Sequence, residues 1–344
     1  LSQYKQPIEM YKGPMRFRTA IANNYLAGIT KLFEQVGYDV VTRSASSFGL
    51  DTLSKIENSQ EILYAGKNTT ITEIANFYSI FSNLGIQTGI KNPENGLIES
   101  KLIRKIEFSD GLPIEEVYSE SQVLLNSQLA YLVHDVLQDD YERRETLGHP
   151  NPLEIGRPSA AKYGATFTKD EIWTAGYTPK YVSVIWFGQK GEPTISLNES
   201  IAGGVWYAMM QWLHQEMPVT NWQKPIGLSE VAVCSLSGLL PTQECPETIP
   251  EIFIDGTLPS GLDNLFRNFE INRETGLLAT VYTPSELIDS RTYMLVPEEA
   301  QEWAQYSNIE VPPTNYDLIQ APRPNEDVFI NSPENFSYVK GTVD

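Results

Sequence analysis

The chain has 344 residues and 41% hydrophobic side chains, enough for one large globular domain with a smaller addition. Its 25 basic and 44 acidic residues give a net charge of −19, which repels nucleic acid and anionic lipid headgroups and excludes both as expected partners. The longest apolar run, residues 201–213, is shorter than the roughly 20 residues that span a bilayer. No Gly-rich phosphate loop, internal repeat or low-complexity segment is apparent, so no cofactor is expected.

The first half of the chain contains three segments with the apolar spacing of helices that bury one face. Residues 14–37 predict a helical pair with inward positions Phe17, Ile21, Ile29, Leu32, Phe33 and Val36. Residues 70–85 predict a structural helix with the apolar stripe Ile71, Ile74, Tyr78, Phe81 and Leu84. Residues 127–148 predict a helix and an Arg-containing turn, with core positions Leu129, Leu132, Val133, Val136 and Leu137.

Residues 157–188 predict three antiparallel strands followed by a core helix. The runs 159–165 and 172–175 are separated by a polar turn, and Pro179 marks a second turn. Residues 181–187 are rich in β-branched and aromatic side chains, which predicts a strand buried on both faces. The apolar run 201–213 predicts a core helix.

This block resembles a conserved stretch of the penicillin-binding protein transpeptidase domain. Lys162-Tyr163-Gly164-Ala165 stands where that family has Lys-Thr-Gly-Thr, followed by a Trp-x-x-Gly-Tyr-Thr-Pro segment and a Trp-containing strand. The matching residues are Trp173, Gly176, Tyr177, Thr178, Pro179 and Trp186. The similarity covers roughly residues 14–215. It implies an α+β fold, an α/β sandwich of the penicillin-binding protein and β-lactamase type, with an antiparallel sheet flanked by helices and a small C-terminal extension.

The resemblance also gives the positions of a degenerate site. Residues 14–37 resemble the family segment with the Ser-x-Asn motif, in which the serine relays protons and the asparagine holds the substrate amide. The vestigial site comprises Asn24 and Leu26 at those two positions, together with Lys162, Tyr163, Gly164, Ala165 and Thr166. No catalytic residue is intact.

Each substitution at this site has a chemical consequence. Lys162 either supplies positive charge to a carboxylate or is a surface lysine at a strand end. Tyr163 replaces a small threonine beside the nucleophile, and we expect its phenol to pack against a neighbour. Ala165 lacks the hydroxyl that binds the substrate carboxylate, and strand alternation disfavours Thr166 as its substitute.

The family's nucleophile and lysine lie on one helical turn as Ser-x-x-Lys, because side chains at i and i+3 share a helix face. Residues 1–23, which precede Asn24, contain no such motif. Ser159-Ala160-Ala161-Lys162 matches the pattern but lies on a predicted strand, where i and i+3 point to opposite faces. Ser337-Tyr338-Val339-Lys340 lies in a polar tail. We therefore expect the motif to be either upstream of residue 1 or absent.

Residues 216–264 are rich in Pro and Glu and predict a linker on the main domain, resembling the linker of bifunctional class A penicillin-binding proteins. Cys234 and Cys245 form a candidate disulfide, which would require a compartment outside the cytoplasm. A zinc site is not supported, because the three histidines are dispersed and are expected on helix surfaces or in turns.

The predicted organisation is a transpeptidase-like domain at 1–215 that lacks its N-terminal part, a linker at 216–264 and a C-terminal extension at 265–344. The extension predicts a strand near 291–297, a short helix at 298–306 with Trp303 facing inward, and a Pro-rich end.

Two functions follow from the resemblance. The first is a catalytically degenerate module at the cell envelope that binds a peptidoglycan stem peptide or a protein partner. The second is an active D,D-transpeptidase whose Ser-x-x-Lys lies upstream of residue 1. Both imply an extracytoplasmic location, with any membrane attachment through an N-terminal anchor upstream.

Overall fold

The computed structural model describes residues 8, 11–54, 69–92, 98–99, 103, 105–116, 118–166, 168–189 and 196–317. The helices are α1 (Phe17–Asn23), α2 (Leu26–Val36), α3 (Tyr38–Ser47), α4 (Asp51–Ser54), α5 (Ile71–Ser82), α6 (Ser127–Leu137), α7 (Arg144–Leu147), α8 (Glu199–His214) and α9 (Gln301–Tyr306), with two 3-10 turns, η4 (Ser285–Leu287) and η5 (Glu298–Ala300). The strands are β1 (Ile86–Lys91), β2 (Ile98–Glu99), β3 (Lys105–Glu107), β4 (Pro113–Glu116), β5 (Glu120–Val123), β6 (Ala160–Ala165), β7 (Glu171–Tyr177), β8 (Val182–Gly188), β9 (Leu228–Cys234), β10 (Thr248–Ile254), β11 (Phe266–Asn272) and β12 (Ile288–Met294).

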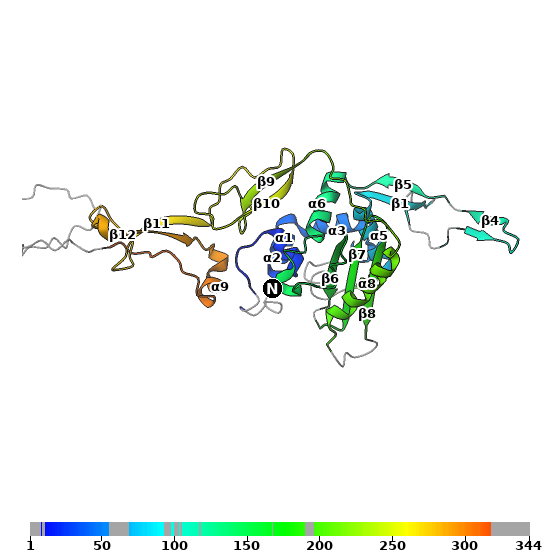
Figure 1. Ribbon diagram of the computed structural model, residues 1–344, viewed down its shortest axis with the longest axis horizontal. Helices are drawn as coiled ribbons and strands as arrows, with labels where there is room; N and C mark the ends of the chain where they lie inside the picture. Colours follow the sequence, from blue (N-terminus) through cyan, green and yellow to red (C-terminus); the bar gives the residue numbers. More distant parts are fainter. Residues whose placement is uncertain are drawn as a thin grey trace, which may run out of the picture.

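The central element is the antiparallel sheet β6-β7-β8, which confirms the three strands predicted at 157–188. Helix α8 contacts all three strands from one side, while α5 and α6 contact the sheet from the other. Figure 1 shows these elements in the middle of an elongated molecule, with β3 and β4 at one end and β11 and β12 at the other. The predicted α+β fold, an antiparallel sheet flanked by helices, is confirmed.

Two hydrophobic clusters hold the helices against the sheet. On the α8 side, the buried residues are Leu153, Ile155, Ala161, Tyr163, Trp206 and Met210. On the opposite side, Phe81, Ala130, Ala160 and Tyr177 form the second cluster. Ala160 and Ala161 belong to different clusters because successive side chains of a strand point to opposite faces. The strand β6 therefore contributes to both cores.

The predicted helices form, but several of their predicted inward positions are wrong. Phe17, Val36, Ile71, Leu129 and Val133 are all between 36% and 44% exposed. In α6 the buried residues are instead Ala130 and His134, four positions apart. Tight packing against β6 selects the small Ala130 for the contact row and leaves larger neighbours at the rim.

The sequence predicted that residues 181–187 form a strand buried on both faces. Strand β8 forms, but it is not buried along its whole length. Trp186 and Phe187, near its end, are 41% and 37% exposed. The burial alternates at the beginning of the strand, where Ser183 is buried. The aromatic and β-branched residues of this run therefore predicted the strand correctly, but the predicted burial of its end is wrong.

A sheet and a hairpin lie between α5 and α6, where no element was predicted. Strand β1 pairs with β2 and β5, and β3 pairs with β4. The β3–β4 hairpin carries exposed apolar side chains, including Phe108 and Leu112. Its strands are only three and four residues long, which is too short for a clear periodic signal.

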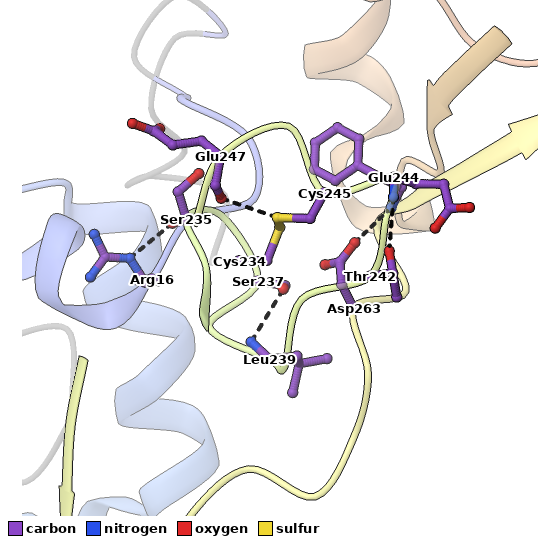
Figure 2. Close-up of a disulfide and its surroundings, with 11 residues drawn as sticks. Arg16, Cys234, Ser235, Ser237, Leu239, Thr242, Glu244, Cys245, Glu247 and Asp263 are labelled. Atoms are coloured by element: carbon purple, nitrogen blue, oxygen red, sulfur yellow. Dashed lines mark hydrogen bonds between the residues drawn. A yellow bond between two sulfur atoms is a disulfide. The ribbon is translucent and has the colours of Figure 1, made fainter. Parts of the chain in front are cut away.

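The predicted linker contains a β-hairpin, β9–β10, that is attached to the main domain by ion pairs. Arg16 and Arg18, near the start of α1, both pair with Glu251 of β10. The Arg16 Nε also donates to the Ser235 carbonyl oxygen at 2.8 Å (Figure 2). Further carboxylates of the network are Glu142, Asp135 and Asp139. The proposed domain boundaries themselves stay a prediction.

Cys234 and Cys245 are joined by a disulfide, with their Cα atoms 5.9 Å apart (Figure 2). Cys234 ends β9 and is fully buried. The Cys245 sulfur lies 3.0 Å from the Glu247 carbonyl oxygen. The bond closes the loop between the two hairpin strands.

The expectation that the chain has no internal repeat is wrong. We call residues 228–263 the first hairpin unit and residues 266–317 the second hairpin unit. In both, a seven-residue antiparallel hairpin is followed by a parallel bridge, Leu240 to Leu262 in the first and Leu278 to Tyr316 in the second. The amide after each bridge donates to the matching leucine carbonyl, Asp263 to Leu240 at 2.7 Å and Asp317 to Leu278 at 2.6 Å.

The turns after the first strands repeat as well. Gly238 and Gly276 have φ angles of 69° and 71°, and their amides donate to Cys234 O and Asn272 O at 2.9 and 2.7 Å. Both positions need the left-handed conformation that glycine adopts freely. The shared sequence is only Gly-Leu-Leu-x-Thr and one later proline, which explains why the repeat was missed.

The C-terminal elements differ slightly from their predicted bounds. Strand β12 begins at Ile288 and ends at Met294, while η5 and α9 cover the predicted helix. Trp303 lies over Gly13, where any Cβ atom would overlap its ring. The prediction that Trp303 faces inward agrees with this contact. Residues 318–344 lie outside the described part of the chain.

Two of the three histidines are buried, so their expected surface roles are wrong. His214 is 2% exposed, and its ring nitrogens lie 2.9 Å from Thr178 Oγ1 and 2.8 Å from Met210 O. His134 is 1% exposed and packs on Trp222, with ring centroids 4.0 Å apart. Among the described residues, no group of three potential metal ligands comes together. Within the same residues, no helix has the length and apolar character to cross a membrane.

Candidate functional site

Two polar side chains from distant parts of the chain meet at β6. Lys162 lies in the middle of this strand, and Asn24 ends α1 with a left-handed φ of 57°. Asparagine tolerates this conformation better than most residues with a Cβ atom. The Lys162 ammonium donates a hydrogen bond to Asn24 Oδ1, and Asn24 Nδ2 donates to Tyr163 O at 3.5 Å. The structure therefore brings together two of the residues that the sequence assigned to the site.

A cavity of about 20 Å³ adjoins this pair. Its lining residues are Ala22, Asn24, Val136, Leu137, Arg143, Thr146, Leu147, Leu153, Ala161, Lys162 and Tyr163. A buried water molecule needs at least roughly 10–15 Å³, so the cavity has room for about one. Pockets that hold small organic ligands are typically ~300 Å³ or larger.

Arg143 is a charged residue of this site that the sequence did not single out. It is 3% exposed, and its guanidinium donates to the carbonyl oxygens of Leu137, Asp139 and Ala161. The ion pair with Asp140 is longer, at 3.6 Å. The only sequence signal for this role was the Arg-containing turn before the strand.

The surroundings of Lys162 disfavour its charged form. Burial lowers the pKa of the Lys162 ammonium to about 7, the nearby positive charge of Arg143 lowers it further, and Glu199 opposes the shift. Burial acts in this direction because a charged amine loses more solvation energy than a neutral one. The Asn24 amide oxygen can accept a hydrogen bond from either form.

Tyr163 points away from Lys162, into the core under α8. It is 5% exposed and packs with Trp206 and Met210. A Cβ atom at Gly203 of α8 would overlap the phenol ring and its oxygen, so the helix lies directly on the tyrosine. The phenol oxygen has no hydrogen-bond partner within the described structure. The expected packing role agrees with this position, and the side chain does not fill the space beside Lys162.

The remaining predicted positions offer little to a substrate. A Cβ atom at Gly164 would make only an ordinary contact, 3.7 Å from Trp173 Cβ. Ala165 is exposed at the strand end. The Thr166 hydroxyl donates a hydrogen bond to the Asp170 carboxylate and accepts one from the Glu171 backbone amide at 3.1 Å. It therefore closes the β6–β7 turn. Leu26 is half-buried in the first turn of α2 and supplies no polar group.

Among the described residues, the arrangement supplies an amine and an amide, whereas acyl transfer by a serine would need further groups. Such a reaction needs a nucleophile, a base, a proton relay and oxyanion donors. Among the residues that line the cavity, Thr146 has the only aliphatic hydroxyl, which donates to Asn23 Oδ1 at 2.8 Å. Ser159 precedes β6, three residues from Lys162 along an extended chain, and Ser337 lies outside the described residues.

Comparisons with known proteins agree with the fold and with the sequence resemblance. The family model described as penicillin-binding protein 1A, C-terminal domain, matches residues 224–268. Penicillin-binding protein 1A of Clostridium botulinum strain Hall is 27% identical over 304 residues, which cover 84% of this chain and 35% of that protein. These matches support a transpeptidase-type region like that of class A penicillin-binding proteins.

Two further matches are more distant. Penicillin-binding protein 1A/1B of Bacillus subtilis is 24% identical over 298 residues, covering 78% of the chain and 30% of that protein. The solved structure of penicillin-binding protein 1A from Haemophilus influenzae aligns with a TM-score of 0.58 and 18% identity, over 74% of this chain and 42% of that one. The chain spans about a third of the length of the curated relatives. The structural likeness is therefore one of fold.

Proposed function

We propose that this chain is a catalytically degenerate transpeptidase-like module that serves as an accessory or structural subunit at the cell envelope. The observation that carries the proposal is the size of the cavity beside Lys162, about 20 Å³. It accommodates roughly one water molecule, far less than a peptide. Residues that would bind and activate a substrate are replaced at the same place.

The hydroxyl groups of the site support the same proposal. Ala165 has none, and that of Thr166 is engaged in the turn with Asp170 and Glu171. Loss of one member of a cooperative catalytic unit already lowers the rate by orders of magnitude, and here several positions differ together. The small volume beside the Lys162–Asn24 pair favours a scaffold over capture of a stem peptide.

The envelope location is part of this proposal. The relatives are named penicillin-binding protein 1A. The disulfide between Cys234 and Cys245 agrees with a compartment outside the cytoplasm, because reducing cytoplasmic conditions disfavour such bonds.

One observation supports the alternative of an active D,D-transpeptidase. Lys162 and Asn24 form a hydrogen bond, and a lysine with a pKa near 7 has a neutral fraction that can move protons at physiological pH. In that alternative, the nucleophile and its Ser-x-x-Lys partner come from upstream of residue 1.

Labelling with a fluorescent β-lactam separates these two functions. The natural full-length protein is incubated with the probe, denatured and resolved on a gel, beside an active penicillin-binding protein as the positive control. We expect no covalent label above that of a sample denatured beforehand. A labelled band that disappears when one upstream serine is replaced by alanine would establish the active alternative.

A titration with a D-Ala-D-Ala stem peptide tests the choice between scaffold and peptide capture. Calorimetry of the chain and of a Lys162→Ala variant with millimolar peptide is expected to give no saturable heat for either. Binding that is lost in the Lys162→Ala variant would identify a peptide-capture module.

A further inference from the structure

The two hairpin units differ in what covers one face of their hairpins. In the first hairpin unit, Glu251 of β10 lies opposite Val231 and binds Arg16 and Arg18 of the main domain. Its side chain is 15% exposed. Burial alone would raise the pKa of the Glu251 carboxyl, but the hydrogen bonds and charges of Arg18 and Arg16 outweigh it and lower that pKa. This face is therefore a docking face within the chain.

The strand registers identify the equivalent face of the second hairpin unit. Cys234 lies opposite Thr248, as Asn272 lies opposite Ile288, so Glu251 corresponds to Arg291 and Val231 to Phe269. The same register makes Arg267 the equivalent of Ser229, on the same face as Arg291. The docking acid of the first unit is thus an arginine in the second.

A second docking position changes in the same way. Ser235 follows β9, and its carbonyl oxygen accepts a hydrogen bond from the Arg16 guanidinium. The equivalent residue after β11 is Arg273. The second hairpin unit contains three basic and nine acidic residues, and all three basic residues lie at these equivalent positions. The charge of the unit is therefore segregated, with the arginines gathered at the docking face.

These arginines are available to a partner. All three residues are exposed, and the Arg291 side chain is 47% exposed to solvent. Its nearest carboxylates are Asp289 at 3.9 Å and Glu310 at 4.0 Å, which are long, exposed pairs that contribute little. The Arg267 and Arg273 side chains have no ion pair within the described residues. Half-buried Phe269 lies opposite Arg291 and packs edge-to-face on Tyr293, with centroids 6.0 Å apart.

We propose that the second hairpin unit is a second docking module, whose face of Arg267, Phe269, Arg273 and Arg291 binds a carboxylate-bearing surface of a partner protein. The first unit shows that this face binds protein through buried carboxylate–arginine pairs. The equivalent face of the second unit carries arginine in place of glutamate, so it favours a partner with negative charge. Like charges across an interface are strongly disfavoured. Arginine and aromatic side chains are also the residues enriched in protein interfaces. The proposal does not depend on whether the Lys162 site is active.

Fluorescently labelled poly-L-glutamate serves as the probe, in an anisotropy titration of the whole chain at low ionic strength. The test variant is Arg267→Glu, Arg273→Glu and Arg291→Glu together. The matched control is Arg43→Glu, Lys105→Glu and Lys180→Glu, which changes the net charge equally at exposed positions elsewhere. Thermal unfolding curves verify that both variants fold, since all six side chains are exposed.

We expect saturable binding by the unmodified chain, a Kd at least tenfold higher for the test variant, and a change below threefold for the control. Absence of saturable binding, or equal weakening in the two variants, would overturn the proposal. So would polyphosphate of matched charge binding more than tenfold tighter than poly-L-glutamate through the same arginines, because the face would then be a site for a phosphate polymer.

Discussion

The two faces of β6 differ in the surroundings of their side chains. On one face, Tyr163 fills the space under α8 and belongs to a well-packed core with Trp206 and Met210. On the other, Lys162 donates a hydrogen bond to Asn24 next to a cavity of about 20 Å³ that the buried Arg143 also lines. One strand therefore carries a tyrosine that stabilises the fold and a lysine that costs stability. Adjacent residues of one strand can thus meet a packed apolar core on one face and a polar, charged environment on the other.

Replacement of Tyr163 by alanine tests this comparison with the largest expected effect. Removing a buried aromatic side chain typically lowers the free energy of unfolding by about 3–5 kcal/mol, because transfer energy is lost and a cavity remains. Lys162→Ala, one residue away on the opposite face, is expected to change it by less than about 1 kcal/mol in either direction, because loss of side-chain contacts opposes relief of the buried charge. Urea unfolding curves of the two variants measure the difference. Equal losses would show that both faces contribute alike.

Two adjacent glycines of α8 provide a test of direct packing between this helix and Tyr163. Gly203→Ala is expected to cost about 1–3 kcal/mol, because its Cβ atom would overlap the Tyr163 phenol. Gly204→Ala, where a Cβ atom meets nothing within 4 Å, is expected to stabilise by about 0.5–1 kcal/mol through helix propensity. Thermal melts of the pair provide the measurement. Similar changes at both glycines would contradict direct packing of α8 on Tyr163.

The Lys162 face has a pH-dependent cost. Burial and Arg143 lower the pKa of Lys162 from 10.5 to about 7, so the folded state penalises the charged amine. The penalty is complete below pH 7 and disappears above roughly pH 10.5, so this group makes the protein more stable as pH rises between these values. Lys162→Met removes the penalty and is expected to stabilise by about 1–2 kcal/mol below pH 7, a modest value because the side chain is partly exposed.

The control for this variant is the same unfolding measurement at pH 10.5, where the two proteins are expected to differ little. A stabilisation that stays constant from pH 6 to pH 10.5 would instead indicate a gain in packing. A destabilisation at pH 6 would show that the hydrogen bond to Asn24 outweighs the cost of burying the charge.

The smallest expected effect concerns the phenol oxygen of Tyr163. It is buried without a hydrogen-bond partner in the described structure, so Tyr163→Phe removes an unsatisfied polar group. We expect a change between zero and about 1 kcal/mol of stabilisation, in contrast to Tyr163→Ala. A loss above 1 kcal/mol in urea unfolding would show that the hydroxyl has a partner, such as a buried water.

The sequence predicted the central strands because their turns and apolar runs are local signals. A family resemblance also placed Asn24 and Lys162 in the same site. The sequence could not predict the direction of the Tyr163 side chain relative to α8, or the burial of Arg143 and His134, because these depend on contacts between distant segments. Periodicity also placed Leu129 and Val133 in the core, whereas the small Ala130 decides which face of α6 approaches the sheet.

The duplicated hairpin units show a second limit of sequence analysis. The cross-link between Cys234 and Cys245 has a polar equivalent in the second hairpin unit, where Asp317 accepts hydrogen bonds from Asn272 and Thr283 at 2.7 and 3.0 Å. The same positions are joined by different chemistry, so residue identity was lost while backbone geometry was kept. Only the three-dimensional hydrogen-bond pattern reveals the relationship.

We propose that the Lys162 face does not support acyl transfer. Mass spectrometry of the intact full-length protein, after prolonged incubation with a penicillin, tests it most directly because a single acyl adduct adds the mass of the drug. We expect an unchanged mass, with complete conversion of an active penicillin-binding protein treated in parallel. Stoichiometric addition of one drug molecule would contradict it.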